Sequence, residues 1–238
     1  MGILRRRMMM AKKNEDLANK YMTVVALQDN TTVKFSKSGL QYSRNGSEWF
    51  NAGTSTITLQ KGEKVMFKGN MVPSTNGIGK FKMSGSCNLE GNCFSLILGD
   101  SASNNVDLSS YTKPLFYDLF SGCTAISKVS EDFLPATTLS NWCYDGTFYG
   151  CTNLIQAPNL LASHVPPLAY EYMFYNCKNL SYIKMMAKTL EGNGQGKSPL
   201  NKWVTGVAST GTFVKSKDAT WDATGESGVP SGWTILTE

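Results

Sequence analysis

The sequence predicts a mainly β fold: a small antiparallel β-sandwich over residues 21–100, then a short stack of repeats over residues 110–238. Two observations predict this fold. In the first half, segments rich in β-branched and aromatic residues recur about every 8–12 residues, and several alternate polar and apolar side chains as half-buried strands do. In the second half, one seven-residue motif occurs three times. Residues 1–20 form a separate basic arm, which we expect to be helical or extended.

The first half contains a series of candidate strands separated by turn-forming residues. In chain order they read MTVVAL, TVKFS, LQYS, EWF, TITLQ, KVMFKG, KFKMSG and FSLIL. The pair Asn45-Gly46 lies between LQYS and EWF and favours a type I′ hairpin turn. Residues 101–113 are mostly polar and predict a loop between the halves. Many short strands of this kind favour an antiparallel sandwich.

The repeated motif centres on a cysteine. Its copies are FSGCTAI at 120–126, FYGCTNL at 148–154 and FYNCKNL at 174–180. In each copy the cysteine, which is Cys123, Cys151 or Cys177, follows a phenylalanine by three residues and precedes an aliphatic residue by three. A cysteine at one position of every repeat is typical of a small apolar side chain that stacks on its equivalents. We therefore expect a ladder of buried thiols.

Two alternatives to the thiol ladder remain. The chain has six cysteines, an even number that could pair as disulfides, and Cys87 and Cys93 could close a hairpin. A zinc site would need paired ligands at close spacing, and His164 is the only histidine. The regular spacing of the motif cysteines favours the ladder over both.

Side chains that follow each motif cysteine divide into an inner and an outer set. The expected inner residues are Ile126 and Val129, Leu154 and Ala157, and Leu180 and Ile183. The residues before the second member of each pair, Lys128, Gln156 and Tyr182, then fall on the exposed face, and Lys184 lies beyond. Stacked repeats would align these side chains into one column, the kind of surface that repeat proteins use for binding. We expect these four residues to contact a partner.

The repeat half resembles a known family. The segments FYGCTNLIQAPNL, LPATTLSNWCY and WVTGVASTGTFVKS, with GVPSGWTI near the end, are similar to BspA-like leucine-rich repeats. Such repeats occur in surface proteins of Bacteroides-type bacteria and in their phages. The resemblance implies a leucine-rich repeat solenoid over residues 110–238, closed by a C-terminal cap, with a preceding β-sandwich. Residues 201–214 are then a degenerate repeat that leads into the cap, and Val207 ends the cysteine column.

Residues capable of catalysis are present, but their pattern does not indicate an enzyme. His164 lies in a loop-like stretch with no evident nucleophile. Asp118 and Asp145 lie beside aromatic residues at what we take to be equivalent repeat positions, which favours an architectural role. Tryptophans could stack on sugars, yet core packing or capping explains them more simply. We expect a non-enzymatic protein with no catalytic residue, cofactor or metal.

The positive charge is concentrated in the arm. Residues 1–20 hold six basic and two acidic residues, a net charge of +4 out of the chain's +5. We expect Arg5, Arg6 and Arg7 to anchor the chain to other proteins of an assembly. Binding a packaged genome is the competing role, but no other basic face is evident, so we expect no nucleic-acid partner. No apolar run reaches the roughly 18 residues of a membrane span, and the stretch after the arginines is too short for an export leader.

These features together favour a phage virion protein made in a bacterial host's cytoplasm. We expect a structural or adhesive subunit, such as a tail or head fibre or a receptor-binding subunit, that forms a homo-oligomer within the particle. Its repeat half would contact a host surface protein or glycan. The alternatives are a bacterial cell-surface adhesin of the BspA-like class and a carbohydrate-binding module.

Overall fold

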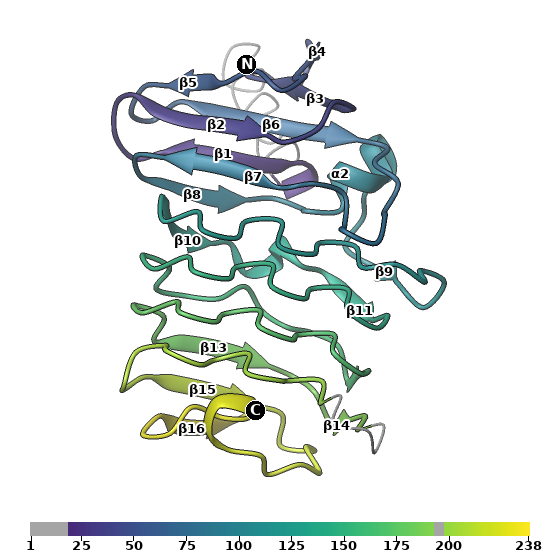
Figure 1. Cartoon of the computed structure of the whole chain (residues 1–238), viewed down its shortest axis with the longest axis vertical. Coiled ribbons are helices and arrows are strands. Elements are labelled where there is room, and N and C mark those ends of the chain that lie inside the picture. The colour runs from purple at the N-terminus through teal and green to yellow at the C-terminus, as the bar shows by residue number, and fades with distance from the viewer. Residues whose placement is uncertain (1–18, 193–197) are drawn as a thin grey trace, which may run out of the picture.

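The computed structural model describes residues 19–192 and 198–238, and its fold is mainly β with several small sheets, as the sequence predicts. Figure 1 shows an elongated molecule, with the strands of the first half at one end and β13, β15 and β16 towards the C-terminal end. The predicted anchoring residues Arg5, Arg6 and Arg7 lie outside the described residues. Within the described part, no helix is long and apolar enough to cross a membrane.

Two antiparallel sheets form the first half. One contains β1 (Met22–Ala26), β3 (Leu40–Ser43), β4 (Phe50–Asn51), β6 (Lys64–Gly69) and β8 (Cys87–Glu90), in the order β8-β1-β6-β3-β4. The other contains β2 (Thr31–Phe35), β5 (Ile57–Leu59) and β7 (Phe81–Ser84), in the order β5-β2-β7. In β2 every second side chain is buried, as expected of a strand with one face on a core. Phe67 of β6 meets Phe81 of β7 with ring centroids 5.3 Å apart, so the two sheets share that core.

The segment FSLIL forms a short helix and not the predicted strand. It contains α2 (Ser95–Leu98), followed by the 3₁₀ turn η1 (Gly99–Ser101). A short apolar run without alternation fits either a buried helix or a buried strand. The Ser95 hydroxyl donates to the Phe67 carbonyl and accepts from the Met22 amide. These bonds fasten the helix to the sheet.

The hairpin around Asn45 forms, but its turn is longer than predicted. Tyr42 pairs with Phe50, and the connection between β3 and β4 spans residues 44–49. Gly46 has a φ of 73°, whereas Asn45 is not left-handed as a type I′ turn requires. The Asn45 side-chain oxygen instead accepts the amides of Ser47 and Glu48, each at 3.0 Å. A side-chain turn has replaced the backbone turn.

The polar segment at 101–113 is not only a loop. It contains β9 (Val106–Asp107), which pairs in parallel with β11 (Ala136–Thr138). Val106 and Leu108 are buried, and their apolar side chains pack this otherwise polar segment against the core. The link between the halves is therefore part of the packed structure.

In the second half, parallel strands continue the sheet of the first. β10 (Ile126–Val129) pairs with β8, and single bridges join Lys128 to Gln156 and Gln156 to Tyr182 of β13 (Tyr182–Met185). Beyond them lie β15 (Thr212–Lys215) and β16 (Thr234–Thr237). Smaller elements are β12 (His164–Val165), which pairs with β14 (Thr189–Leu190), and the 3₁₀ turns η2 (Glu131–Phe133) and η3 (Gly225–Ser227).

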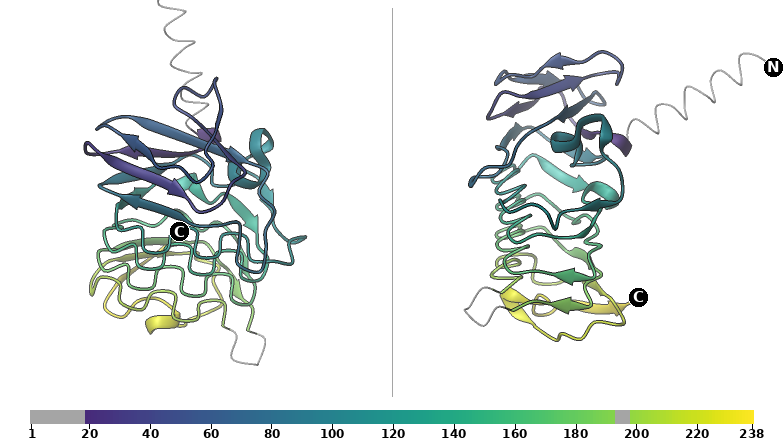
Figure 2. Two further views of the ribbon diagram at one scale, coloured as in Figure 1. Left: turned by 45° about the horizontal axis from the view of Figure 1, so that its top comes forward. Right: turned by 90° about the vertical axis from the view of Figure 1, so that its right-hand side faces the viewer.

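The motif segments lie in turns that stack on one another. The Phe120 amide donates to Thr147, the Phe148 amide to Met173 and the Phe174 amide to Trp203, at 2.9, 3.0 and 2.8 Å. Figure 2 shows these segments as parallel turns lying one above the next. Each copy of the motif is thus one level of a hydrogen-bonded stack.

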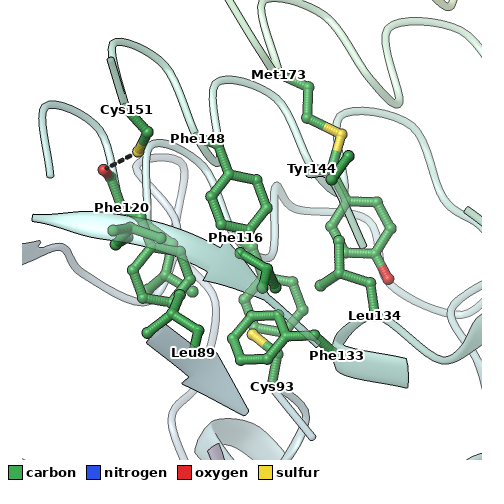
Figure 3. Close-up of a cluster of buried hydrophobic side chains, with 14 of the residues drawn as sticks. Leu89, Cys93, Phe116, Phe120, Phe133, Leu134, Tyr144, Phe148, Cys151 and Met173 are labelled. Carbon is green, nitrogen blue, oxygen red and sulfur yellow. Dashed lines mark hydrogen bonds between the residues drawn. The ribbon is translucent and has the colours of Figure 1, made fainter. Parts of the chain in front are cut away.

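Aromatic rings form a column through the levels. The rings of Phe81, Phe120, Phe148 and Phe174 stack in that order, with centroids 5.4, 5.4 and 5.8 Å apart. A second column runs through Phe116, Tyr144 and Tyr170 (Figure 3 shows its first members beside Phe148). Trp203 packs on both Tyr170 and Phe174 and closes the two columns. The first column begins in β7, so a single core joins the two halves.

The prediction of buried thiols is confirmed. All six cysteines are buried and free. Cys123, Cys151 and Cys177 donate to the carbonyls of Phe81, Phe120 and Phe148, at 3.3, 3.2 and 3.1 Å (Figure 3 shows the middle bond). Burial raises the pKa of Cys123 to about 12. Each motif cysteine therefore fills the core as a neutral thiol and also satisfies a carbonyl of the level before it.

Candidate binding site

The four partner-contact residues predicted from the sequence do lie together. Lys128, Gln156 and Tyr182 are successive bridge partners and so form the expected column. Lys128 is exposed, and the other two are half-buried. Their six predicted inner neighbours are all buried. Whether this column binds anything stays a prediction.

Lys184 differs from the other three because it already has a partner. Its ammonium lies 2.9 and 2.8 Å from the two carboxylate oxygens of Glu238. The hydrogen bond to Glu238 raises the pKa of Lys184. The ion pair joins β13 to the C-terminal residue, so Lys184 is less available for a partner than Lys128.

A small groove of about 240 Å³ lies beside the head of the column. Lys128, Gln156 and Glu131 line it together with Asn88 and Ser130. The Asn88 side-chain oxygen and the Ser130 hydroxyl are buried and have no hydrogen-bond partner among the described residues. Unsatisfied polar atoms of this kind can accept or donate bonds to a bound group.

A larger groove, which sequence reasoning missed, lies over the stacked turns. We call it the tyrosine groove, and its volume is about 470 Å³. It is lined by Tyr117, Tyr149, Tyr172 and Tyr175 and by Asp118, Asp145 and Lys202. These residues come from four successive levels of the stack.

The register of the stack decides which residues meet in the tyrosine groove. The Asp118 amide donates to the Asp145 carbonyl, and the Phe120 amide donates to that of Thr147. Because Phe120 is equivalent to Phe148, the equivalent of Asp118 is Gly146 and not Asp145. The prediction that the two aspartates occupy equivalent positions is therefore wrong by one residue, although both carboxylates lie on adjacent levels of one groove.

Backbone conformation fixes the turn at this point in each level. Asp118, Gly146, Tyr172 and Lys202 have φ values of 53°, 61°, 50° and 48°. Such values are rare for residues with a side chain, and strained non-glycine residues concentrate at functional sites. Three of the four are not glycine, and all three line the groove.

The tyrosine rings of the groove pack on one another. Tyr149 and Tyr175 are parallel, with centroids 4.9 Å apart and an interplanar angle of 4°. Tyr172 meets Tyr175 edge to face at 5.8 Å. The sequence signal was the tyrosine after the phenylalanine in two of the three motifs. The position of these tyrosines depends on the register between levels, which places the Tyr175 ring over the Tyr149 ring.

The charged groups in and beside the groove differ in their partners. The Lys80 ammonium lies 2.6 Å from the Asp118 carboxylate. The Asn201 amide donates to Glu171 at 2.7 Å. Asp145 has no ion pair or side-chain hydrogen bond with any described residue. Burial, then the charges of Glu171 and Asp118, raise its pKa to about 7.

Two further candidates make hydrogen bonds within the described part of the chain. Trp203 is buried and donates to the Gly228 carbonyl, which agrees with a capping role. His164 lies in β12, exposed, with ring nitrogens 2.7 Å from Thr189 and 3.2 Å from Glu191. These contacts join β12 to β14 and to Glu191, the residue that follows β14.

Comparisons with known proteins do not assign the chain to a family. No family model, curated protein or solved structure matches it.

Proposed function

We propose that this chain is a non-enzymatic adhesive protein, built as a β-sandwich followed by a short BspA-like leucine-rich repeat solenoid with a C-terminal cap. We further propose that it is a fibre or receptor-binding subunit of a phage virion, anchored through its arm and oligomeric within the particle. Its repeat half would contact a host surface protein or glycan.

One observation carries this proposal: side chains from successive levels line up on the surface of the stack. Lys128, Gln156 and Tyr182 form one such column, joined by backbone bridges. A stack of repeats gives a rigid, extended surface on which weak contacts recur. Many copies in one particle would convert weak single contacts into firm attachment.

Replacing Lys128, Gln156 and Tyr182 together by alanine tests the adhesive role. Lys128 is exposed and the other two are only half-buried, so the free energy of unfolding should change by about 1 kcal/mol or less. Attachment of particles to host cells should weaken. Unchanged attachment by a stable variant would remove this column from the proposal.

Mass spectrometry of purified virions tests the location. The chain should be present in particles, and a chain that begins at Tyr21 should fold but fail to incorporate. Presence in the bacterial outer membrane and absence from particles would contradict the virion proposal and favour the cell-surface adhesin.

A further inference from the structure

The tyrosine groove brings carboxylates and tyrosine rings together on its first two levels. Tyr117 and Asp118 line it on the first level, Asp145 and Tyr149 on the second, and Tyr172 and Tyr175 on the third. Lysine and arginine side chains bind well to this combination, because the carboxylate supplies charge and the ring face attracts cations.

The protein itself fills the first level with a cation. The Lys80 ammonium lies 2.6 Å from the Asp118 carboxylate and 5.7 Å from the centre of the Tyr117 ring. The next level supplies the same two kinds of group from other positions of the repeat, since Asp145 is equivalent to Tyr117 and Tyr149 is equivalent to Ser121. The contact of Lys80 with Asp118 and Tyr117 shows how a carboxylate and a tyrosine ring of this groove bind a basic side chain.

The second level also has a carboxylate and a tyrosine ring, Asp145 and Tyr149, at other positions of the repeat. Asp145 is half-buried, and no described residue forms an ion pair or a side-chain hydrogen bond with its carboxylate. The third-level carboxylate, Glu171, is already satisfied by the Asn201 amide. A partly buried carboxylate that lacks a counter-charge is costly, and a ligand cation would remove that cost.

We propose that the tyrosine groove binds a basic side chain of a partner protein, a lysine ammonium or an arginine guanidinium, against Asp145 and the ring of Tyr149. Tyr149 is 37% exposed, so its ring remains accessible although it stacks on Tyr175. The volume of about 470 Å³ admits a side chain of this size. An arginine fits best, because its flat guanidinium can stack on a ring while it bonds a carboxylate.

The charges around Asp145 agree with a cationic ligand. Asp118 and Glu171 are the neighbours whose charges raise its pKa, after burial itself. The two lysines of the region are Lys80, which is paired with Asp118, and Lys202, which lines the groove two levels above. Neither lysine lowers the pKa of Asp145. A bound cation would favour the ionised carboxyl and release a proton.

A neutral glycan is the competing ligand. It would also use the tyrosine rings, and it would hydrogen-bond to a carboxyl in either protonation state. Its affinity would therefore depend little on the ionisation of Asp145. The pH dependence of binding separates the two classes of ligand.

Titration of the full-length chain with the peptide acetyl-Gly-Arg-Arg-Arg-Gly-amide, by calorimetry at fixed ionic strength, tests the proposal. The ionised fraction of a carboxyl with a pKa of about 7 rises from about 0.1 at pH 6 to about 0.9 at pH 8. Affinity should therefore rise by up to about tenfold over this range. Asp145→Asn should lose about tenfold at pH 8 and show no such rise.

The control is Asp132→Asn, which makes the same charge change at an exposed residue outside the groove. It should bind as the unsubstituted chain does. Tyr149→Leu, which removes the ring but keeps an apolar side chain, should weaken binding several-fold at both pH values. Circular dichroism confirms that each variant is folded.

Three results would overturn the proposal. They are no peptide binding by the unsubstituted chain, equal binding by Asp145→Asn at pH 8, and binding of a neutral oligosaccharide that Asp145→Asn retains at both pH values. The assay needs no virion, so a failure of the virion proposal would leave this result unaffected.

Discussion

In each repeat the motif cysteine and the residue before it have different roles. The thiol fills the core and donates to a carbonyl of the previous level, as Cys151 does to Phe120. The preceding residues, Gly122, Gly150 and Asn176, turn the chain with φ values of 75°, 69° and 58°. This conformation favours glycine and tolerates asparagine, which explains why the motif reads Gly-Cys twice and Asn-Cys once.

Substitution of Gly150 tests the backbone role on its own. A Cβ added there would meet its nearest atom, the Gly122 Cα, at 3.8 Å, which is ordinary contact. The left-handed φ is thus the main cost, and Gly150→Ala should lower the free energy of unfolding by about 1–2 kcal/mol. Urea unfolding measures the change. Asn176→Gly is the matched control and should be neutral or stabilising; equal losses in both variants would contradict the conformational explanation.

Asp145 should make stability depend on pH. Its folded pKa of about 7 lies above the unfolded value near 4, so the folded state binds the proton more tightly. The resulting stabilisation is present below about pH 4 and is lost as pH rises towards 7 and above. Asp145→Asn should therefore match the unsubstituted chain at pH 4.5 and exceed it by roughly 1–2 kcal/mol at pH 8, after allowance for solvent screening.

Urea unfolding of the two chains at both pH values measures this difference. Asp132→Asn again serves as the control, since it removes an exposed carboxylate. The same stability difference at pH 4.5 and pH 8 would show that the Asp145 carboxyl does not titrate in this window.

At the scale of elements, the thiol ladder joins each level to the one before it. Cys151→Asp would place a charge in a fully buried site whose neighbours are Phe120 and Phe148. It should cost about 3–5 kcal/mol. Cys151→Ala, which loses only the sulfur and its hydrogen bond, should cost about 1–2 kcal/mol. Thermal unfolding compares the two, and similar losses would contradict a tightly packed ladder.

The sequence predicted the elements whose signals are local. The repeated Phe-x-x-Cys spacing predicted the levels and the buried thiols, and alternation predicted β2. FSLIL was predicted wrongly because a short apolar run has no period, and the contacts that hold it, such as the bond from Ser95 to the distant Phe67 carbonyl, are tertiary. Phe81 was missed as the start of the column because no motif cysteine follows it.

The predicted column was found because it follows from strand alternation within one repeat. The tyrosine groove was missed because it depends on the register between repeats. Asp118 and Asp145 lie on adjacent levels and differ by one residue in register, and both line the groove. Register is a tertiary property, and the repeat spacings of 28 and 26 residues between motif cysteines do not fix it.

At the scale of the whole molecule, the two halves share both a sheet and a core. β8 of the first half pairs with β10 of the second, and Phe81 stacks on Phe120. The Cys123 thiol bonds the Phe81 carbonyl across the same junction. A stack of this kind cannot bury its first level alone, so the first half acts as the cover for the repeats.

Alkylation of the native cysteines across a urea series, read by mass spectrometry, tests this shared core most directly. Cys87 reports on the first half and Cys177 on the last motif, and both are fully buried and free. The shared sheet and core predict that both thiols resist alkylation in the folded state and become reactive, without reductant, at one common urea midpoint. Reaction of Cys177 at a clearly lower urea concentration, while Cys87 stays protected, would contradict the account and show that the repeats unfold on their own.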